Sequence, residues 1–221
     1  MGLSLEVGVL AGLSEHDPKG AEWFREDLRK LNGLLKQAGL SPHAEPETCP
    51  IFSVDMIGYA GLHYVRRLAA HLELRGELPD PGDDDAGNDP VLLKYYKLLN
   101  SPHVFSRLLG RKLPTRQFDH LINHSDSEGF YVPQDFADVL VAPPELGVSG
   151  GLVGSSFRLL EETGKLAEAI NLPIETDPDS DAVCEAIESQ GEGEVTWQRY
   201  AMESHPCLQL HRVALPGDLA F

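Results

Sequence analysis

Residues 3–39 read LSLEVGVLAGLSEHDPKGAEWFREDLRKLNGLLKQAG, and this stretch decides the fold class. Its first seven residues alternate apolar and polar or small side chains, which is the period of a half-buried β-strand. Asp17-Pro18 then combines a preferred N-cap residue with the preferred first helical residue. The apolar positions that follow have helical spacing, and Gly39 is a typical helix stop. These apolar positions are Trp23, Phe24, Leu28, Leu31, Leu34 and Leu35.

The rest of the chain continues this mixture of helices and short strands. Residues 41–50 contain three prolines and predict a loop. Helical patterns predict further helices, and two stretches read as extended chain. The expected helices cover residues 59–74, 91–99, 155–170, 181–189 and 196–213, and the extended stretches are 118–132 and 139–141.

Helices outnumber strands in this reading, and the strands are too irregularly spaced for a doubly wound sheet. We therefore expect an α+β fold, rich in helix, with a small mixed sheet covered by several helices. A length of 221 residues favours one domain over 1–221. Residues 77–90 (ELPDPGDDDAGNDP) are too polar and proline-rich to pack, so they predict an acidic surface loop. We also expect a loose C-terminus.

Composition excludes several classes of protein. No apolar stretch is long enough to span a membrane. The N-terminus has neither a secretory leader pattern nor a myristoylation motif, because Glu6 stands where that motif needs Ser or Thr. The three cysteines, Cys49, Cys184 and Cys207, are far apart and form no C-x-x-C pair, which is typical of reducing cytosol. We expect a cytoplasmic protein.

The net charge of −17 is concentrated in the second half of the chain. Residues 1–116 contain 14 basic and 16 acidic side chains, whereas residues 117–221 contain 4 and 19. An acidic surface repels phosphates, so direct nucleic-acid binding by the second half is not expected. The charge serves either solubility or the docking of a basic partner. The basic stretch 94–116 offers a third account, in which it pairs with the acidic half.

A metal site is one hypothesis for residues 118–128. In an extended chain, alternate side chains share a face, so His120, His124, Asp126 and Glu128 would line up. Imidazole and carboxylate groups bind zinc, manganese or iron, and they also act as general acids and bases. His63 is a further candidate ligand, from a helix stripe that continues through Arg67 and His71. The structural alternatives are a strand that ends in a polar turn and an ordinary helix flank.

An anion site is the hypothesis for the glycine-rich stretch 147–156. Free backbone N–H groups and a helix N-terminus attract a phosphate or carboxylate. The stretch lacks the lysine of a P-loop and the serine position of a nucleophile elbow. The alternative is a flexible connection with Ser155 or Ser156 as the helix N-cap. The candidate anion-binding residues are Gly151, Gly154, Ser155, Ser156 and Arg67.

Several segments resemble a family of uncharacterised bacterial cytosolic proteins. They are MGLSLEVGVLAGL with the Trp23-Phe24 helix, GYAGLHYVRRLAAHL, FDHLINHSDSEGFYVPQDF and GLVGSSFRLLEETGKLAEAI. The resemblance runs to about Pro173, which favours a single domain. It implies no activity for any residue, and only by class analogy does it point to an immunity protein.

Two functions follow as expectations. The first is a binding protein, similar to an immunity or regulatory protein, whose acidic half engages a basic protein partner. The second is a hydrolase in which His120, His124 and Asp126, with Glu128 and His63, hold a divalent metal that activates water. Charge evidence spans about a hundred residues, so we rank the binding protein first.

Overall fold

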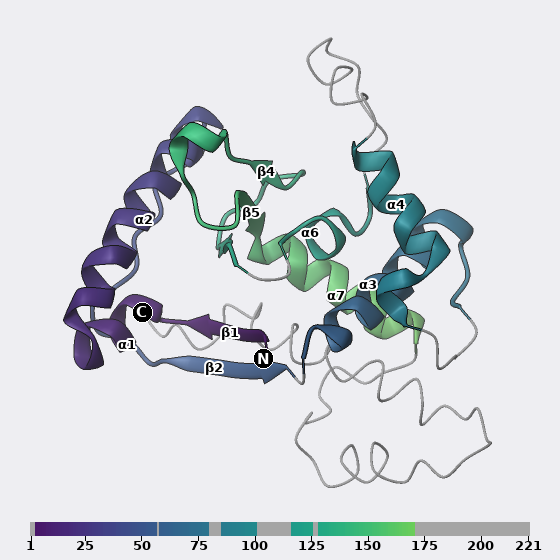
Figure 1. Cartoon of the computed structure of the whole chain (residues 1–221), viewed down its shortest axis with the longest axis horizontal. Helices are drawn as coiled ribbons and strands as arrows, with labels where there is room; N and C mark the ends of the chain where they lie inside the picture. Colours follow the sequence, from purple (N-terminus) through teal and green to yellow (C-terminus); the bar gives the residue numbers. More distant parts are fainter. Residues whose placement is uncertain (1–2, 57, 80–84, 101–115, 126–127, 171–221) are drawn as a thin grey trace, which may run out of the picture.

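The computed structural model describes residues 3–56, 58–79, 85–100, 116–125 and 128–170 (Figure 1). The helices expected at 181–189 and 196–213, the expected loose C-terminus and most of the basic stretch 94–116 lie outside these residues. The described chain combines helices with a two-stranded and a three-stranded sheet. The fold is therefore α+β and rich in helix, as predicted. Figure 1 shows helix α2 on one side of the molecule and helices α3 and α4 on the other.

The N-terminal strand is confirmed, but it ends earlier than its sequence pattern predicts. Strand β1 (Leu3–Val7) pairs antiparallel with β2 (Phe52–Met56), a strand that the sequence analysis missed. Gly8 then takes a left-handed conformation (φ 79°), and helix α1 (Val9–His16) begins directly after it. A Cβ at Gly8 would come within 2.9 Å of the Pro50 carbonyl oxygen, so only glycine fits this reversal. The chain turns there because of glycine, not because the apolar alternation stops.

Helix α2 (Pro18–Gln37) starts and stops close to the predicted residues. Pro18 is its first residue, and Gly39 has a φ of 75° just beyond its end. Trp23 shares the helical spacing of the apolar positions, but it is 79% exposed. Trp23 lies just outside the buried stripe of the helix. The buried residues of α2 are Ala21, Leu28, Leu31, Leu34 and Leu35.

Two hydrophobic clusters form the core of the described chain. One cluster joins α1 and α2 to the three-stranded sheet, and it includes Leu31, Leu35 and Val153. The other joins α3 (Gly58–Arg75), α4 (Pro90–Asn100) and α7 (Ser156–Ala169) around Leu68, Leu92 and Leu166. All three of these helices were predicted within a residue or two. No helix in the described part of the chain is long and apolar enough to cross a membrane.

The predicted acidic loop at 77–90 is partly described. Residues 80–84 lie outside the described chain, and Ala86–Asn88 form a 3-10 turn, η1, capped by the Asp85 side chain. Asp89 then caps α4 by accepting hydrogen bonds from the N–H groups of Val91 and Leu92. Its carboxylate also pairs with Arg67 and His71 of α3 at 3.2 Å. The end of this loop is therefore tied to α3.

The three-stranded sheet is mixed, in the order β3-β5-β4. Strand β5 (Leu152–Ser155) pairs parallel with β3 (Phe130–Val132) and antiparallel with β4 (Leu140–Val141). A 3-10 turn, η2 (Pro144–Leu146), follows β4. The prediction that residues 118–132 are extended was wrong for its first part, because Asp119–Ile122 form the short helix α6. Figure 1 shows α6 close to α7, and the contacts below explain this helix.

Candidate functional site

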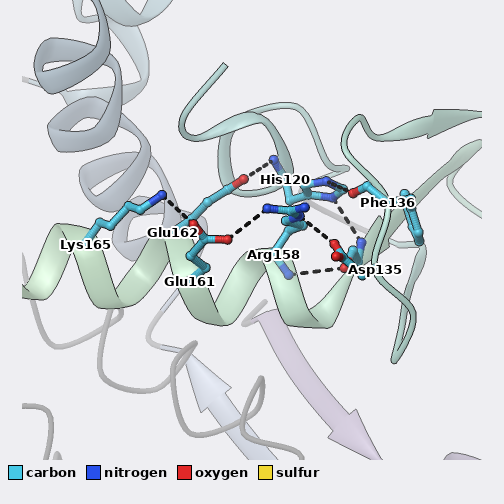
Figure 2. A network of polar contacts seen from close by, with 8 residues as sticks. His120, Asp135, Phe136, Arg158, Glu161, Glu162 and Lys165 are labelled. Atoms are coloured by element: carbon cyan, nitrogen blue, oxygen red, sulfur yellow. Dashed lines mark hydrogen bonds and ion pairs between the residues drawn. The ribbon is translucent and has the colours of Figure 1, made fainter. Parts of the chain in front are cut away.

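Buried polar groups connect α6, α7, β5 and the loop after β3 (Figure 2). The side chain of Glu162 on α7 is 4% exposed, and its two oxygens accept hydrogen bonds from the backbone N–H groups of His120 (3.1 Å) and Leu121 (2.7 Å). These are N–H groups of the first turn of α6, which have no partner within the helix. Burial raises the pKa of Glu162 to about 8, although both hydrogen bonds favour the carboxylate. Glu162 therefore supplies the acceptors that a helical turn needs at residue 119, and the chain there is helical instead of extended.

His120 connects this helix to the neighbouring loop. Its Nδ1 accepts a hydrogen bond from the Ser155 N–H at 3.0 Å, so its Nε2 carries the proton and donates to the Phe136 carbonyl at 3.1 Å. The ring is fully buried, and this burial lowers the pKa of His120. Both nitrogens are therefore occupied in the neutral ring. His120 positions the loop and has no lone pair left for a metal.

His124 is also buried in the fold. Its ring stacks on Tyr131 with centroids 4.0 Å apart, and its nitrogens lie 3.1 Å from the Ser125 carbonyl and 3.0 Å from the Phe130 carbonyl. Burial lowers the pKa of His124 to about 4, so the ring is neutral near pH 7. A neutral ring donates to only one of these carbonyls at a time. His124 therefore has a structural role, because it holds the chain at the start of β3.

The expected metal-binding residues do not share a strand face. His120 lies in α6, His124 follows it, and Glu128 is exposed before β3. His63 lies on α3, where its ring is close to Gly87. Asp126 is outside the described residues. Among the residues that the structure describes, no three His, Cys, Asp or Glu side chains form a group that could hold a metal. The metal-dependent hydrolase therefore has no support from the described chain.

The expected anion-binding residues are used within the fold. The Ser155 hydroxyl accepts from the Arg158 N–H at 3.1 Å, so Ser155 is the N-cap of α7. Ser156 donates to the Val132 carbonyl at 3.4 Å. Gly154 is buried in β5 against Tyr131, where a Cβ would clash at 2.4 Å. Gly151 lies in the turn before β5 with a φ of 68°. Arg67, on α3, pairs with Asp89, which directly precedes α4. The anion site stays a prediction, because the groups expected to bind the anion make contacts within the fold.

The loop between β3 and β4 displays two exposed carboxylates, Asp135 and Asp138. We call residues 133–139 the acidic loop edge. Buried groups fix its backbone at two points, since the Asp119 carboxylate accepts from the Val139 N–H at 3.0 Å and His120 binds the Phe136 carbonyl. Gln134 adds two hydrogen bonds to the backbone of Ser41, at 2.9 and 3.1 Å. An irregular loop is thus held rigidly against the rest of the fold.

An ion-pair row on α7 continues from this edge (Figure 2). Arg158 contacts Asp135 at 2.7 Å and Glu161 at 3.0 Å, and Lys165 contacts Glu161 at 2.7 Å. Residues 128–170 contain seven acidic side chains and only these two basic ones. Glu162 is buried, and the other six acids are exposed. They are Glu128, Asp135, Asp138, Glu145, Glu161 and Glu168.

Residues 128–170 therefore carry more acidic than basic side chains. The charge asymmetry of the sequence predicted that the second half of the chain is acidic, but it did not predict which residues form this surface. Asp135 and Asp138 could not be predicted as site residues, because nothing in the sequence around them distinguishes a fixed loop from a mobile one. Glu162 escaped attention because an acid among apolar helix residues normally faces solvent. We name the acidic loop edge together with Glu161 and Glu168 the acidic face.

Comparison with protein families matches almost the whole chain to one family model. The family described as putative DNA-mimic protein matches residues 1–216, so the chain belongs to this family. No curated protein and no solved structure matches the chain. The family is uncharacterised, in agreement with the resemblance seen in the sequence.

Proposed function

We propose that this member of the DNA-mimic family binds the DNA-binding surface of a basic protein, with carboxylates of its acidic second half in the place of DNA phosphates. The family match over residues 1–216 carries the proposal, and it explains a half-chain with 19 acidic and 4 basic side chains. Proteins bind DNA largely by setting Lys and Arg against its regular row of negative charge. A protein surface with unneutralised carboxylates attracts the same cations.

The acidic face supports this proposal in the described chain. A mimic of DNA must hold its charges in place, because ordering mobile side chains and loops on binding weakens association. Asp119, His120 and Gln134 fix the loop that carries Asp135 and Asp138. Helix α7 adds Glu161 and Glu168, and it directly precedes the acidic residues of 171–221 in the sequence. The consequence for the cell is regulator-like or immunity-like, because a bound partner is kept from DNA.

Competition with DNA tests the proposal. The chain is immobilised, basic proteins from a bacterial lysate are captured at low salt, and a captured protein is purified. Its binding to a fluorescent DNA duplex is then measured by anisotropy while the free chain is added. We expect stoichiometric displacement of the duplex and an affinity that falls steeply with salt. A ternary complex, or an affinity independent of salt, would falsify the proposal.

A matched pair of variants locates the surface. Asp135→Asn, Asp138→Asn, Glu161→Gln and Glu168→Gln together remove four charges from the acidic face. The control removes four exposed charges from the first half, at Glu6, Glu15, Glu22 and Glu47. We expect the first variant to lose at least tenfold in affinity and the control to change little. Equal losses would mean that net charge, rather than this face, determines binding.

A further inference from the structure

The acidic loop edge covers the ring of a buried histidine. The Phe136 carbonyl accepts a hydrogen bond from Nε2 of His120 at 3.1 Å, and the Phe136 ring packs edge-on against the imidazole with centroids 5.4 Å apart (Figure 2). The His120 side chain is fully buried in this arrangement. Its Nδ1 accepts from the N–H of Ser155 at the end of β5, so the ring connects the loop to the sheet. Displacement of the loop removes the Phe136 contacts and admits water to the imidazole.

The other attachments of this loop are few and lie mostly at the surface. Val139 donates its N–H to the buried Asp119 carboxylate at 3.0 Å. Gln134 makes two exposed hydrogen bonds to the chain after α2, and Asp135 pairs with Arg158 at 2.7 Å. Exposed ion pairs and hydrogen bonds add little stability, and irregular surface segments open at a lower free energy than the helical core. The loop can therefore detach while the helices stay packed.

The surroundings of His120 favour its neutral form while the loop is closed. Burial lowers the pKa of His120, although the Asp119 charge and the hydrogen bonds to the loop backbone oppose this, and the Arg158 charge lowers the pKa further. A water-exposed imidazole instead has the ordinary pKa of about 6.5. The titratable and charged groups that face His120 are Asp119 on α6, Arg158 and Glu162 on α7, His124 after α6 and Tyr131 on β3.

We propose that the acidic loop edge is an acid-sensitive clasp, which acidification releases from His120 while the helices stay packed. The released ring binds a proton below about pH 6.5 and the covered ring does not, so release becomes easier as pH falls. A protonated imidazole also has no lone pair on Nδ1 for the Ser155 N–H, so the closed arrangement needs the neutral ring. Glu162 bonds the α6 backbone and not the loop, so it stays buried in the released state and releases no opposing proton.

The clasp links acidity to the surface that carries the proposed function. Asp135 and Asp138 lie on the released segment, so their carboxylates lose their fixed positions when the clasp opens. Partner binding should then weaken, because the loop must be ordered again on association. This consequence rests on the proposed function, whereas the release itself is a property of the free chain. The experiment below uses no partner, so it can fail or succeed independently of that function.

Amide hydrogen exchange of the full chain, resolved by residue with NMR between about pH 5 and 7.5, tests the clasp. This range stays above the usual titration of exposed carboxylates. We expect the protection factor of the Val139 amide to fall roughly fivefold to thirtyfold between about pH 6.5 and 5. It should stay well below that of Leu31, a core residue of α2 that exchanges only on global unfolding. Protection of Val139 that is independent of pH, or equal to that of Leu31, overturns the proposal.

Three variants identify the group that responds to pH. His120→Gln has no titrating ring, so the pH dependence of Val139 protection should disappear. Gln134→Ala removes the exposed hydrogen bonds of the loop, so it should lower protection by a similar factor at every pH and keep the pH dependence. His124→Gln removes the other buried imidazole and should also keep it. The ring carbon shifts of His120 in the unaltered chain give a second readout, in case His120→Gln does not fold, and they should titrate below pH 6.5. A pH dependence that persists in His120→Gln, or a ring that titrates at or above pH 6.5, rejects the clasp.

Discussion

Arg66 and Glu162 hold opposite ends of the four-residue helix α6. Glu162 accepts hydrogen bonds from the N–H groups of His120 and Leu121, while Arg66 donates to the carbonyls of Leu121 and His124 at 2.9 and 2.6 Å. The Arg66 side chain is 3% exposed. The acceptor oxygens of Glu162 at the N-terminus and the Arg66 cation at the C-terminus both interact favourably with the helix dipole. Two distant helices, α3 and α7, therefore determine the conformation of residues 119–122.

Replacing Glu162 with glutamine tests this dependence. The glutamine amide has only one acceptor oxygen and points an N–H₂ group at a backbone N–H, so one buried donor loses its partner. We expect the free energy of unfolding to fall by about 1–3 kcal/mol, measured by urea denaturation. The neighbouring Glu161→Gln is the matched control, and its exposed ion pairs predict a change within about 1 kcal/mol. Equal effects of the two substitutions would contradict the role of Glu162.

Removal of Arg66 gives the complementary prediction. Arg66→Met keeps an apolar stem but leaves the carbonyls of Leu121, His124 and Ser125 without their buried donor. We expect a loss of about 2–4 kcal/mol in urea denaturation. Arg29→Met, at a side chain that is 73% exposed, should change stability by less than about 1 kcal/mol. In the double variant with Glu162→Gln, the losses should be less than additive, because both residues support α6. Strict additivity would show that the two ends act independently.

Stability should fall as pH rises from 6.5 to 8. The pKa of Glu162 is raised in the folded chain to about 8, so the folded state binds more protons than the unfolded state between pH 4.5 and 8, and stability falls as pH rises through this window. The pKa of His124 is lowered to about 4, and that of His120 is also lowered by burial. For these histidines the unfolded state binds more protons below pH 6.5, so stability rises with pH up to that value.

Two variants separate the limbs of this profile. Below pH 6.5 the histidines and Glu162 change stability in opposite directions, and above it Glu162 acts alone among these three groups. Glu162→Gln should therefore flatten the limb between pH 6.5 and 8, where each pH unit is worth on the order of 1 kcal/mol. His124→Asn should make the limb below pH 6.5 less steep. Urea midpoints measured from pH 4.5 to 8 decide this, and an alkaline limb that persists in Glu162→Gln would refute the assignment.

The sequence predicts helices well where one segment contains its own signals. Pro18 and Gly39 mark the ends of α2, and the apolar spacing of α3 predicts it within one residue at each end. Helix α6 could not be predicted in this way, because Glu162 and Arg66 lie 42 and 55 residues from their partners in it. The same limit applies to the site. Charge asymmetry indicates which half is acidic, but the contacts that fix the acidic loop edge exist only in the folded chain.

Association with a basic partner should become faster when either of the two cations next to the acidic face, Arg158 or Lys165, is replaced. Arg158 and Lys165 are the only basic side chains of residues 128–170, and they neutralise part of the charge of Asp135 and Glu161. Arg158→Gln or Lys165→Gln adds one net negative charge there. We expect each to raise the association rate constant about twofold to fivefold at 50 mM salt, measured by stopped-flow fluorescence with the captured partner. The gain should disappear at 500 mM salt, where such charges are screened. Arg29→Gln makes the same change in net charge on α2, and its effect should be smaller. A slower association of Arg158→Gln would instead show that the ion pair with Asp135 is needed to hold the acidic loop edge in its binding conformation.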